Sequence, residues 1–89
     1  MAWKNISYIL CSPLSRKILE VLNKKSPLAP LQIAKEANIA RGNVSTKLIE
    51  LRKRKLVECV NPDAHKWRFY KITTEGKRVL KEVEKIKKV

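Results

Sequence analysis

The sequence predicts a mainly helical domain that carries one small β-hairpin. Over most of the chain, apolar residues recur at the three- and four-residue intervals of amphipathic helices. Residues 56–60 and 67–72 depart from this pattern, because they are rich in β-branched and aromatic residues and flank a turn-forming Asn-Pro-Asp segment. A length of 89 residues, 44% of them apolar, is that of a single domain, 1–89, with its own core.

Three helices are expected before the most basic part of the chain. The first covers 3–10. Ser12 and Pro13 provide an N-cap and a first-turn proline for a second helix. Pro30 opens a short third helix, and Asn38 follows it in a turn.

A fourth helix is expected over about 41–54, because apolar residues repeat there at i, i+4 and i+7 and polar residues occupy the other side. The hairpin follows, and Thr73 or Thr74 then caps a final helix. This is the order of a helix-turn-helix followed directly by a hairpin, which makes a winged helix-turn-helix. Flanking helices are expected within 1–12 and 75–89.

The charge of the chain predicts an acidic partner. The net charge is +13 and the sequence pI is about 10.2. Residues 41–71 are the most basic part, with nine Lys and Arg against three Asp and Glu. Nucleic acid is the commonest partner of such a chain, and an anionic membrane surface is the second. No apolar run approaches the ~20 residues that cross a bilayer, so we expect nucleic acid and no membrane.

No group of residues predicts catalysis or a cofactor. The chain has one His and one Asp, and its only glycines, Gly42 and Gly76, do not form a loop that cradles a nucleotide. Cys59, Asp63 and His65 fall in one hairpin, but no other residue supports a metal site there. We therefore expect neither an enzyme nor a metal-binding protein.

The two cysteines, Cys11 and Cys59, have apolar neighbours and no CxxC spacing. They are predicted to be buried free thiols and not a disulfide. Free thiols are typical of a reducing cytoplasm, which is the expected location. The short apolar segment near the N-terminus lacks a cleavage-site pattern, so it does not predict a signal peptide.

An ordered set of residues completes the pattern. In chain order it comprises Ala34, Ile39, Val44, Ser45, Leu48, Leu56, Val57, Glu58, Tyr70, Ile72, Thr73 and Gly76. Through this set, residues 13–80 resemble the winged helix-turn-helix of ArsR/MarR-like transcriptional regulators, archaeal members above all. The resemblance implies a regulator that binds double-stranded DNA as a homodimer. Neither the operator sequence nor an effector ligand follows from it.

Three positions depart from the family pattern. Asn38 replaces the usual Gly in the turn, and Asn is the best non-glycine residue for a left-handed backbone. Ala40 replaces the usual Ser or Thr N-cap of the fourth helix at a cost of about 1 kcal/mol, although a bound phosphate can take over the free amides. Lys55 stands where a Gly commonly ends that helix, and its charge suits the helix C-terminus.

The resemblance places the fourth helix in the major groove of DNA. Its candidate base and phosphate contacts are Arg41, Asn43, Ser45, Thr46 and Lys47. Arg suits guanine and Asn suits adenine; the alternative is that these side chains only solvate the helix. Arg54 is a candidate ligand for a flanking phosphate, and Glu50 is expected to pair with it at i+4.

The wing, 61–68, is expected on the DNA backbone or in the minor groove. Its candidate contacts are His65, Lys66 and Arg68. Alternation along the second strand puts Arg68 on the face opposite Trp67 and Phe69, and the pattern does not decide whether these two aromatic residues are packed or exposed.

Both flanking helices carry an apolar stripe that makes them candidate dimer contacts. The residues concerned are Trp3, Ile6, Leu10, Val79, Val83 and Ile86. Packing of the two helices on each other within one chain is the alternative. Two other functions stay open: a sequence-nonspecific, chromatin-like architectural DNA-binding protein, which the net charge favours, and a winged helix that binds protein, which the many Lys and Arg disfavour.

Overall fold

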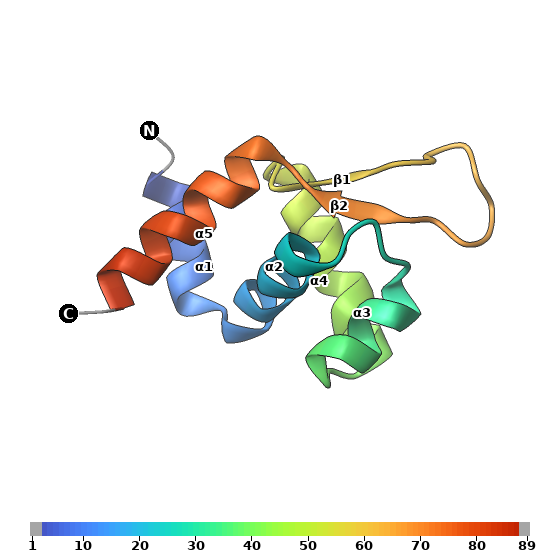
Figure 1. The fold of residues 1–89 in the computed structure, drawn as a ribbon, viewed down its shortest axis with the longest axis horizontal. Coiled ribbons are helices and arrows are strands. Elements are labelled where there is room, and N and C mark those ends of the chain that lie inside the picture. Colours follow the sequence, from blue (N-terminus) through green and yellow to red (C-terminus); the bar gives the residue numbers. More distant parts are fainter. Residues whose placement is uncertain (1–2, 88–89) are drawn as a thin grey trace.

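The computed structural model describes residues 3–87, and within them the chain forms five helices and one two-stranded antiparallel sheet (Figure 1). In chain order the elements are α1 (Trp3–Cys11), α2 (Pro13–Lys24), α3 (Pro30–Ala37), α4 (Arg41–Lys53), β1 (Val57–Cys59), β2 (Tyr70–Ile72) and α5 (Thr74–Lys87). The expected order of helices and hairpin is confirmed. The outer ends of the flanking segments predicted at 1–12 and 75–89 lie outside the described residues.

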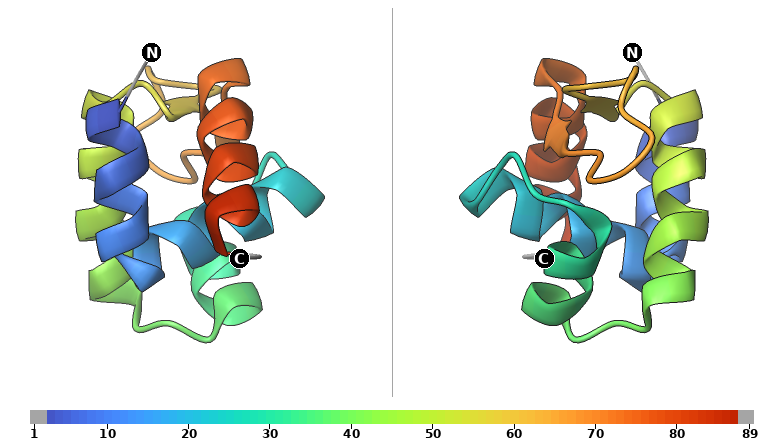
Figure 2. Two further views of the ribbon diagram at one scale, coloured as in Figure 1. Left: turned by 90° about the vertical axis from the view of Figure 1, so that its left-hand side faces the viewer. Right: turned by 90° about the vertical axis from the view of Figure 1, so that its right-hand side faces the viewer.

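The elements form an elongated body of 41 × 25 × 20 Å. Figure 1 shows the hairpin extending at one end, and α1 and α5 at the other. α1 and α5 pack against each other, and the left view of Figure 2 shows them side by side. α2 contacts all four other helices and also β2 of the sheet. It is therefore the central helix of the fold.

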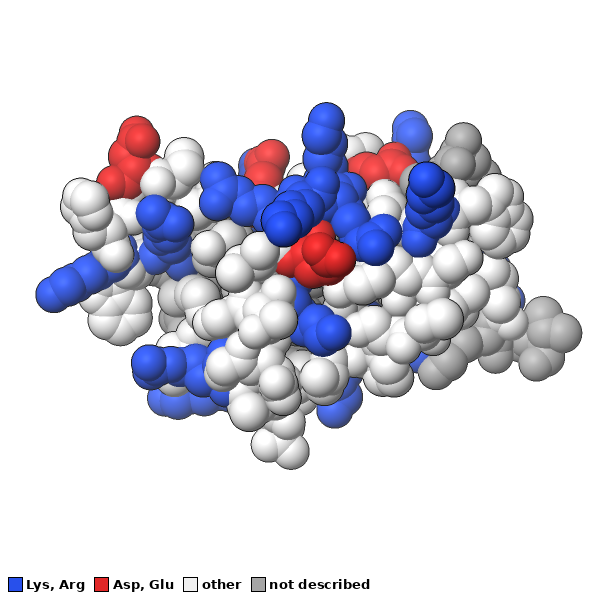
Figure 3. Space-filling view, turned by 180° about the vertical axis from the view of Figure 1, so that it is seen from behind, with Lys and Arg blue, Asp and Glu red and all other residues white. Residues whose placement is uncertain are grey.

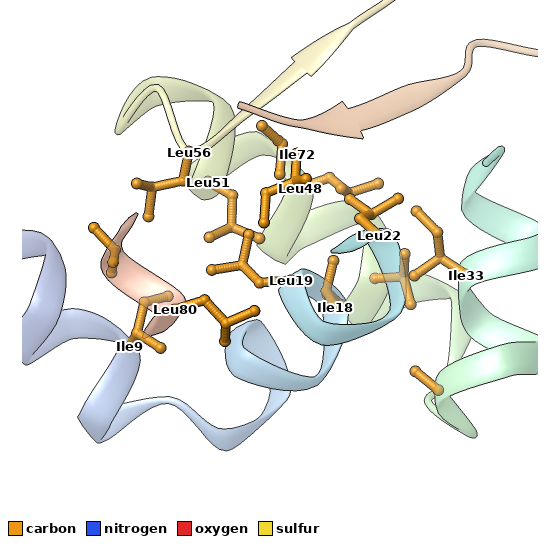
Figure 4. Close-up of a cluster of buried hydrophobic side chains, with 14 of the residues drawn as sticks. Ile9, Ile18, Leu19, Leu22, Ile33, Leu48, Leu51, Leu56, Ile72 and Leu80 are labelled. Atoms are coloured by element: carbon orange, nitrogen blue, oxygen red, sulfur yellow. The ribbon is translucent and has the colours of Figure 1, made fainter. Parts of the chain in front are cut away.

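One hydrophobic core joins these elements (Figure 4). α2 contributes Ile18, Leu19 and Leu22, and α4 contributes Leu48 and Leu51, all of them buried. The other labelled side chains are Ile9, Ile33, Leu56, Ile72 and Leu80. Burial of one such side chain stabilises the fold by about 1.5–3 kcal/mol. The apolar side of α4 is therefore fixed in the core, and its polar side is left at the surface.

The turn between α3 and α4 forms without a glycine. Asn38 adopts a left-handed backbone with φ 56°, as its position predicts. The amide of Ile39 donates to the carbonyl of Ala34 at 3.0 Å, and the Ile39 side chain is buried. These contacts fix the direction in which α4 leaves the turn.

α4 ends in a Schellman motif centred on Lys55. Lys55 has φ 64°, its amide donates to the carbonyl of Arg52 at 3.0 Å, and the amide of Leu56 donates to the carbonyl of Leu51 at 3.0 Å. Glycine usually occupies this left-handed position, because a side chain there costs roughly 1–2 kcal/mol. Burial of Leu56 and Val57 immediately afterwards offsets that cost.

α5 is capped by Thr73, whose hydroxyl accepts the amide of Gly76 at 2.9 Å. Gly76 lies against the backbone that follows α4. A Cβ at this position would overlap the carbonyl oxygen of Leu56 and lie 2.7 Å from Cγ1 of Ile72. α5 packs this closely only because residue 76 is glycine.

β1 and β2 pair with Val57 opposite Ile72 and Cys59 opposite Tyr70. Tyr70 also exchanges two backbone hydrogen bonds with Leu28, at 2.8 and 3.0 Å. The segment before α3 therefore forms a single antiparallel bridge with β2, in addition to the pairing of β2 with β1.

The predicted strands, 56–60 and 67–72, are both too long. Trp67 has φ 56°, a left-handed conformation that a strand does not accommodate. The second strand therefore begins only at Tyr70, and the loop between the strands is longer than the sequence pattern predicts. Trp67 is exposed and Phe69 is half-buried, which answers the question that the alternation leaves open.

Half of the predicted dimer contacts belong to the core of a single chain. Ile6, Val79 and Val83 are buried, because α1 and α5 pack against each other and against α2. For these residues the expectation is corrected, since they have no surface to offer to a second chain. Trp3, Leu10 and Ile86 are exposed.

Cys11 and Cys59 are free thiols, as predicted, but the expected burial is wrong. Cys59 is only partly buried, and Cys11 is exposed. Cys11 lies on the side of α1 opposite Ile6 and Ile9, which face the core.

Candidate nucleic-acid interface

The N-terminal half of α4 presents a polar, accessible side. Arg41, Asn43, Ser45 and Thr46 are exposed, and Lys47 is half-buried. The Thr46 hydroxyl donates to the Gly42 carbonyl one turn earlier, at 3.0 Å, and keeps its lone pairs for an outside donor. The core holds the helix by its other side, so these side chains are available to a ligand.

α4 begins without a side-chain cap. Ala40 occupies the N-cap position and makes no side-chain hydrogen bond, as the sequence predicts. The first amides of a helix have no partner within the helix, and they carry a partial positive charge. This charge adds to that of Arg41, the first residue of α4.

The wing is closed by its own hydrogen bonds. The side-chain carbonyl of Asn61 accepts the amide of Phe69 at 2.8 Å, and its side-chain nitrogen donates to the carbonyl of Trp67 at 3.0 Å. Nε of Arg68 donates to the carbonyl of Ala64 at 2.8 Å. The exposed side chains of the wing therefore project from a defined framework.

A groove of about 370 Å³ separates α4 from the wing. Arg41 and Ser45 line it from α4, and His65, Trp67 and Arg68 line it from the wing. The remaining lining residues are Ala29, Pro30, Leu31 and Tyr70. The groove unites four predicted site residues from two parts of the chain, and it adds Trp67.

The other predicted contacts lie outside this groove. Thr46 and Lys47 line a separate hollow on the side of α4 toward α1, together with Tyr8 and Lys53. Asn43 and Lys66 are exposed and line neither hollow.

The side chain of Arg54 makes contacts within the molecule. Its guanidinium lies over the ring of Tyr8, with Cζ 4.0 Å from the ring centroid. Nη1 donates to Oδ1 of Asn5 at 3.2 Å, and Nη2 lies 3.8 Å from Oε1 of Glu50. The predicted pairing with Glu50 is confirmed. These contacts favour a structural role for Arg54 over the predicted contact with a flanking phosphate, because its guanidinium joins α1 to the C-terminal end of α4.

Basic side chains gather along one edge of the face drawn in Figure 3. Figure 3 shows Lys and Arg along the upper edge of this face and at its wing end, with Asp and Glu interspersed among them. The lower area toward the opposite end is largely uncharged. Arg52, Lys53 and Lys55 of the basic run are exposed.

The hairpin does not assemble a metal site from Cys59, Asp63 and His65. Among residues 3–87, no three His, Cys, Asp or Glu side chains lie close enough together to hold a metal ion. None of the described helices is long and apolar enough to cross a membrane.

Comparison with protein-family models and with curated proteins finds no match. Solved structures do match. Wild-type MarR from E. coli superposes with a TM-score of 0.77 at 19% identity, over 92% of this chain and 62% of that one. RV1404 from Mycobacterium tuberculosis gives a TM-score of 0.77 at 14% identity, over 92% of this chain and 58% of that one. The transcriptional repressor CouR, bound to a 23-mer DNA duplex, gives 0.69 at 22% identity, over 79% of this chain and 50% of that one.

This chain spans between 50% and 62% of the lengths of these three proteins. At identities of 14% to 22%, what is shared is the fold. The chain therefore has the winged helix-turn-helix fold of MarR-like regulators.

Proposed function

We propose that this chain is a transcription regulator that binds double-stranded DNA, with α4 in the major groove and the wing on the adjacent backbone or minor groove. The groove shared by Arg41, Ser45, His65 and Arg68 carries the proposal, because α4 and the wing each contribute an arginine to it. The likeness in fold to CouR, a repressor bound to a DNA duplex, supports the same use of this surface.

The roles follow from the chemistry of each side chain. Arg41 has the fork of donors that matches guanine, and Asn43 has the donor and acceptor that match adenine. Ser45, Thr46 and Lys47 are contacts of lower specificity. The uncapped first turn of α4 suits a phosphate.

The wing residues His65, Lys66 and Arg68 position the duplex. Lys66 is the simplest to test, because Arg68 also holds the loop through Ala64. Replacing Lys66 with Ala should weaken binding to all duplexes and lower the salt dependence of binding by about one phosphate contact. The control is Lys81→Ala, at an exposed residue of α5, the helix at the end of the molecule opposite the hairpin. This variant should leave the salt dependence of binding unchanged. An equal loss for both variants would remove the wing contact from the proposal.

A homodimer is the second part of the proposal. The exposed Trp3, Leu10 and Ile86 on the flanking helices are its candidate contacts. Two chains related by a two-fold axis would present two copies of α4 about 34 Å apart, one turn of DNA. Light scattering should give twice the mass of the chain, and a monomeric mass would refute this part. The ArsR-like and archaeal character that the sequence suggests stays a prediction.

Selection of bound duplexes from a random pool tests the function. A regulator should enrich one motif and bind it about 10³-fold or more tightly than random DNA at physiological salt. A ratio below about tenfold would instead favour the sequence-nonspecific, architectural function, for which the net charge of +13 is the supporting observation.

A further inference from the structure

Among the described residues, Trp67 is the most exposed of the large apolar side chains at 66%, yet its backbone carbonyl is held by Asn61. Its φ of 56° is a conformation that bulky residues rarely adopt. Backbone strain of this kind persists only where the surroundings enforce it, and it concentrates at functional sites. Trp67 is therefore an exposed indole on a constrained backbone, and its surroundings decide what it can contact.

Asn61 enforces the conformation of Trp67. It holds the carbonyl of Trp67 and the amide of Phe69 with the two ends of one side chain, at 3.0 and 2.8 Å. The next residue, Arg68, is tied to Ala64. Asn61 thus holds the two peptide units that follow Trp67, and the indole is exposed and does not pack into the core.

The surroundings of the indole indicate the class of ligand. Trp67 lines the same groove as Arg41 and Ser45 of α4, and His65 and Arg68 lie beside it. A surface that binds another protein through an apolar patch would be continuous and weakly charged. Here an aromatic ring shares a groove with two arginines, Arg41 and Arg68, which suits a ligand that alternates phosphates with the apolar faces of sugars and bases.

We propose that Trp67 is a wedge that enters the minor groove beside the site of α4 and reads how easily the DNA deforms there. The inference rests on the proposed function. Apolar side chains inserted from the minor groove partly unstack a base step and kink the duplex. TA steps unstack readily, whereas A-tracts are stiff. Trp67 therefore gives the chain a preference for flexible steps at a position where base-specific hydrogen bonds are not required.

The test uses two duplexes of equal base composition, alternating poly(dA-dT), which is rich in TA steps, and poly(dA)·poly(dT), which has none. Trp3 and Trp67 are the only tryptophans, so the Trp3→Phe variant leaves Trp67 as the only tryptophan reporter. We expect the fluorescence of Trp67 to be quenched by stacking on the alternating duplex, and binding to that duplex to be tighter by about tenfold. Anisotropy of labelled DNA measures binding separately.

Two variants of the wedge give the decisive comparison. Trp67→Asn removes the ring and keeps a residue that tolerates the left-handed backbone. It should still bind both duplexes but lose the preference between them. Trp67→Phe keeps an aromatic ring and should retain the preference. Lys66→Ala is the matched control, which should weaken both duplexes equally and leave the preference unchanged.

Other results would contradict either the wedge role of Trp67 or the proposed function. Unchanged Trp67 fluorescence on bound DNA, or a preference that survives in Trp67→Asn, would overturn the wedge. The fluorescence result stands even where Trp67→Asn folds poorly, because it is read from the native wing. A blue shift with phosphatidylserine vesicles and none with DNA would assign the indole to a membrane surface and overturn the inference. Failure of the wild-type chain to bind either duplex would instead overturn the proposed function.

Discussion

The two ends of α4 differ in how they contact the rest of the molecule. The N-terminal end has no side-chain cap, and its polar residues are exposed. The C-terminal end is closed by a Schellman motif at Lys55, and Arg54 ties it to Tyr8 and Asn5 of α1. The helix is thus anchored at one end and presented at the other. Binding residues at the presented end can therefore change with little effect on stability.

The largest effect is expected where α4 enters the core. Leu51→Ala should lower the free energy of unfolding by about 2–5 kcal/mol, because Leu51 is fully buried. Ile49→Ala on the same helix should change it by no more than about 0.5 kcal/mol, because Ile49 is 60% exposed. Urea unfolding measures both, and similar losses would contradict the assignment of the two sides of α4.

The close approach of α5 to the segment after α4 gives the next largest effect. Gly76→Ala should cost about 1–3 kcal/mol, because the new Cβ overlaps the Leu56 carbonyl. Gly42→Ala is the matched control at the presented end. It meets nothing within 4 Å and should stabilise the helix by about 0.5–1 kcal/mol. A neutral Gly76→Ala would show that α5 can move away from the hairpin.

Arg41 and Arg54, at the two ends of α4, allow DNA binding and folding to be tested separately. Arg41→Ala should weaken DNA binding by about 1–3 kcal/mol and leave the unfolding midpoint nearly unchanged. Arg54→Ala should lower stability by about 1 kcal/mol, because it removes the contact with Tyr8 and the hydrogen bond to Asn5. It should leave the salt dependence of DNA binding unchanged. The reverse pattern would return Arg54 to the DNA contacts.

The sequence predicts those features that depend on neighbours along the chain. The helix bounds, the left-handed turn at Asn38 and the pairing of Glu50 with Arg54 follow from local periodicity and residue type. Contacts between residues that are far apart in the chain do not follow from local sequence patterns. The stacking of Arg54 on Tyr8 joins residues 46 positions apart, and the pairing of Tyr70 with Leu28 has no local signal.

The start of the second strand is predicted wrongly, although its residues are typical of a strand. Residues 67–72 have the side chains of a strand, so the pattern predicts that the strand starts at Trp67. The side chain of Asn61 holds the carbonyl of Trp67 instead, and the backbone turns there. An Asn before a proline signals a turn, but it does not reveal that its side chain reaches residue 69.

The smallest effect is expected at the cap of α4. Ala40→Ser should stabilise the chain by about 0.5–1 kcal/mol, because a serine hydroxyl accepts a free amide of the first turn. DNA binding should not become tighter, because a phosphate uses the same amides. Thermal unfolding and anisotropy check the two statements, and tighter binding would show that phosphate does not contact this end of α4.

The pairing of Tyr70 with Leu28 has a consequence for dynamics. The Tyr70 amide donates to Leu28 at 2.8 Å, so the base of the hairpin is bonded to the segment that leads into α3. The hairpin therefore cannot swing open without separating from the helix-turn-helix, and the amide of Tyr70 should exchange with solvent on the slow timescale of global unfolding. A partner therefore meets the base of the hairpin and the segment before α3 already joined, and no entropy is lost in bringing these two segments together.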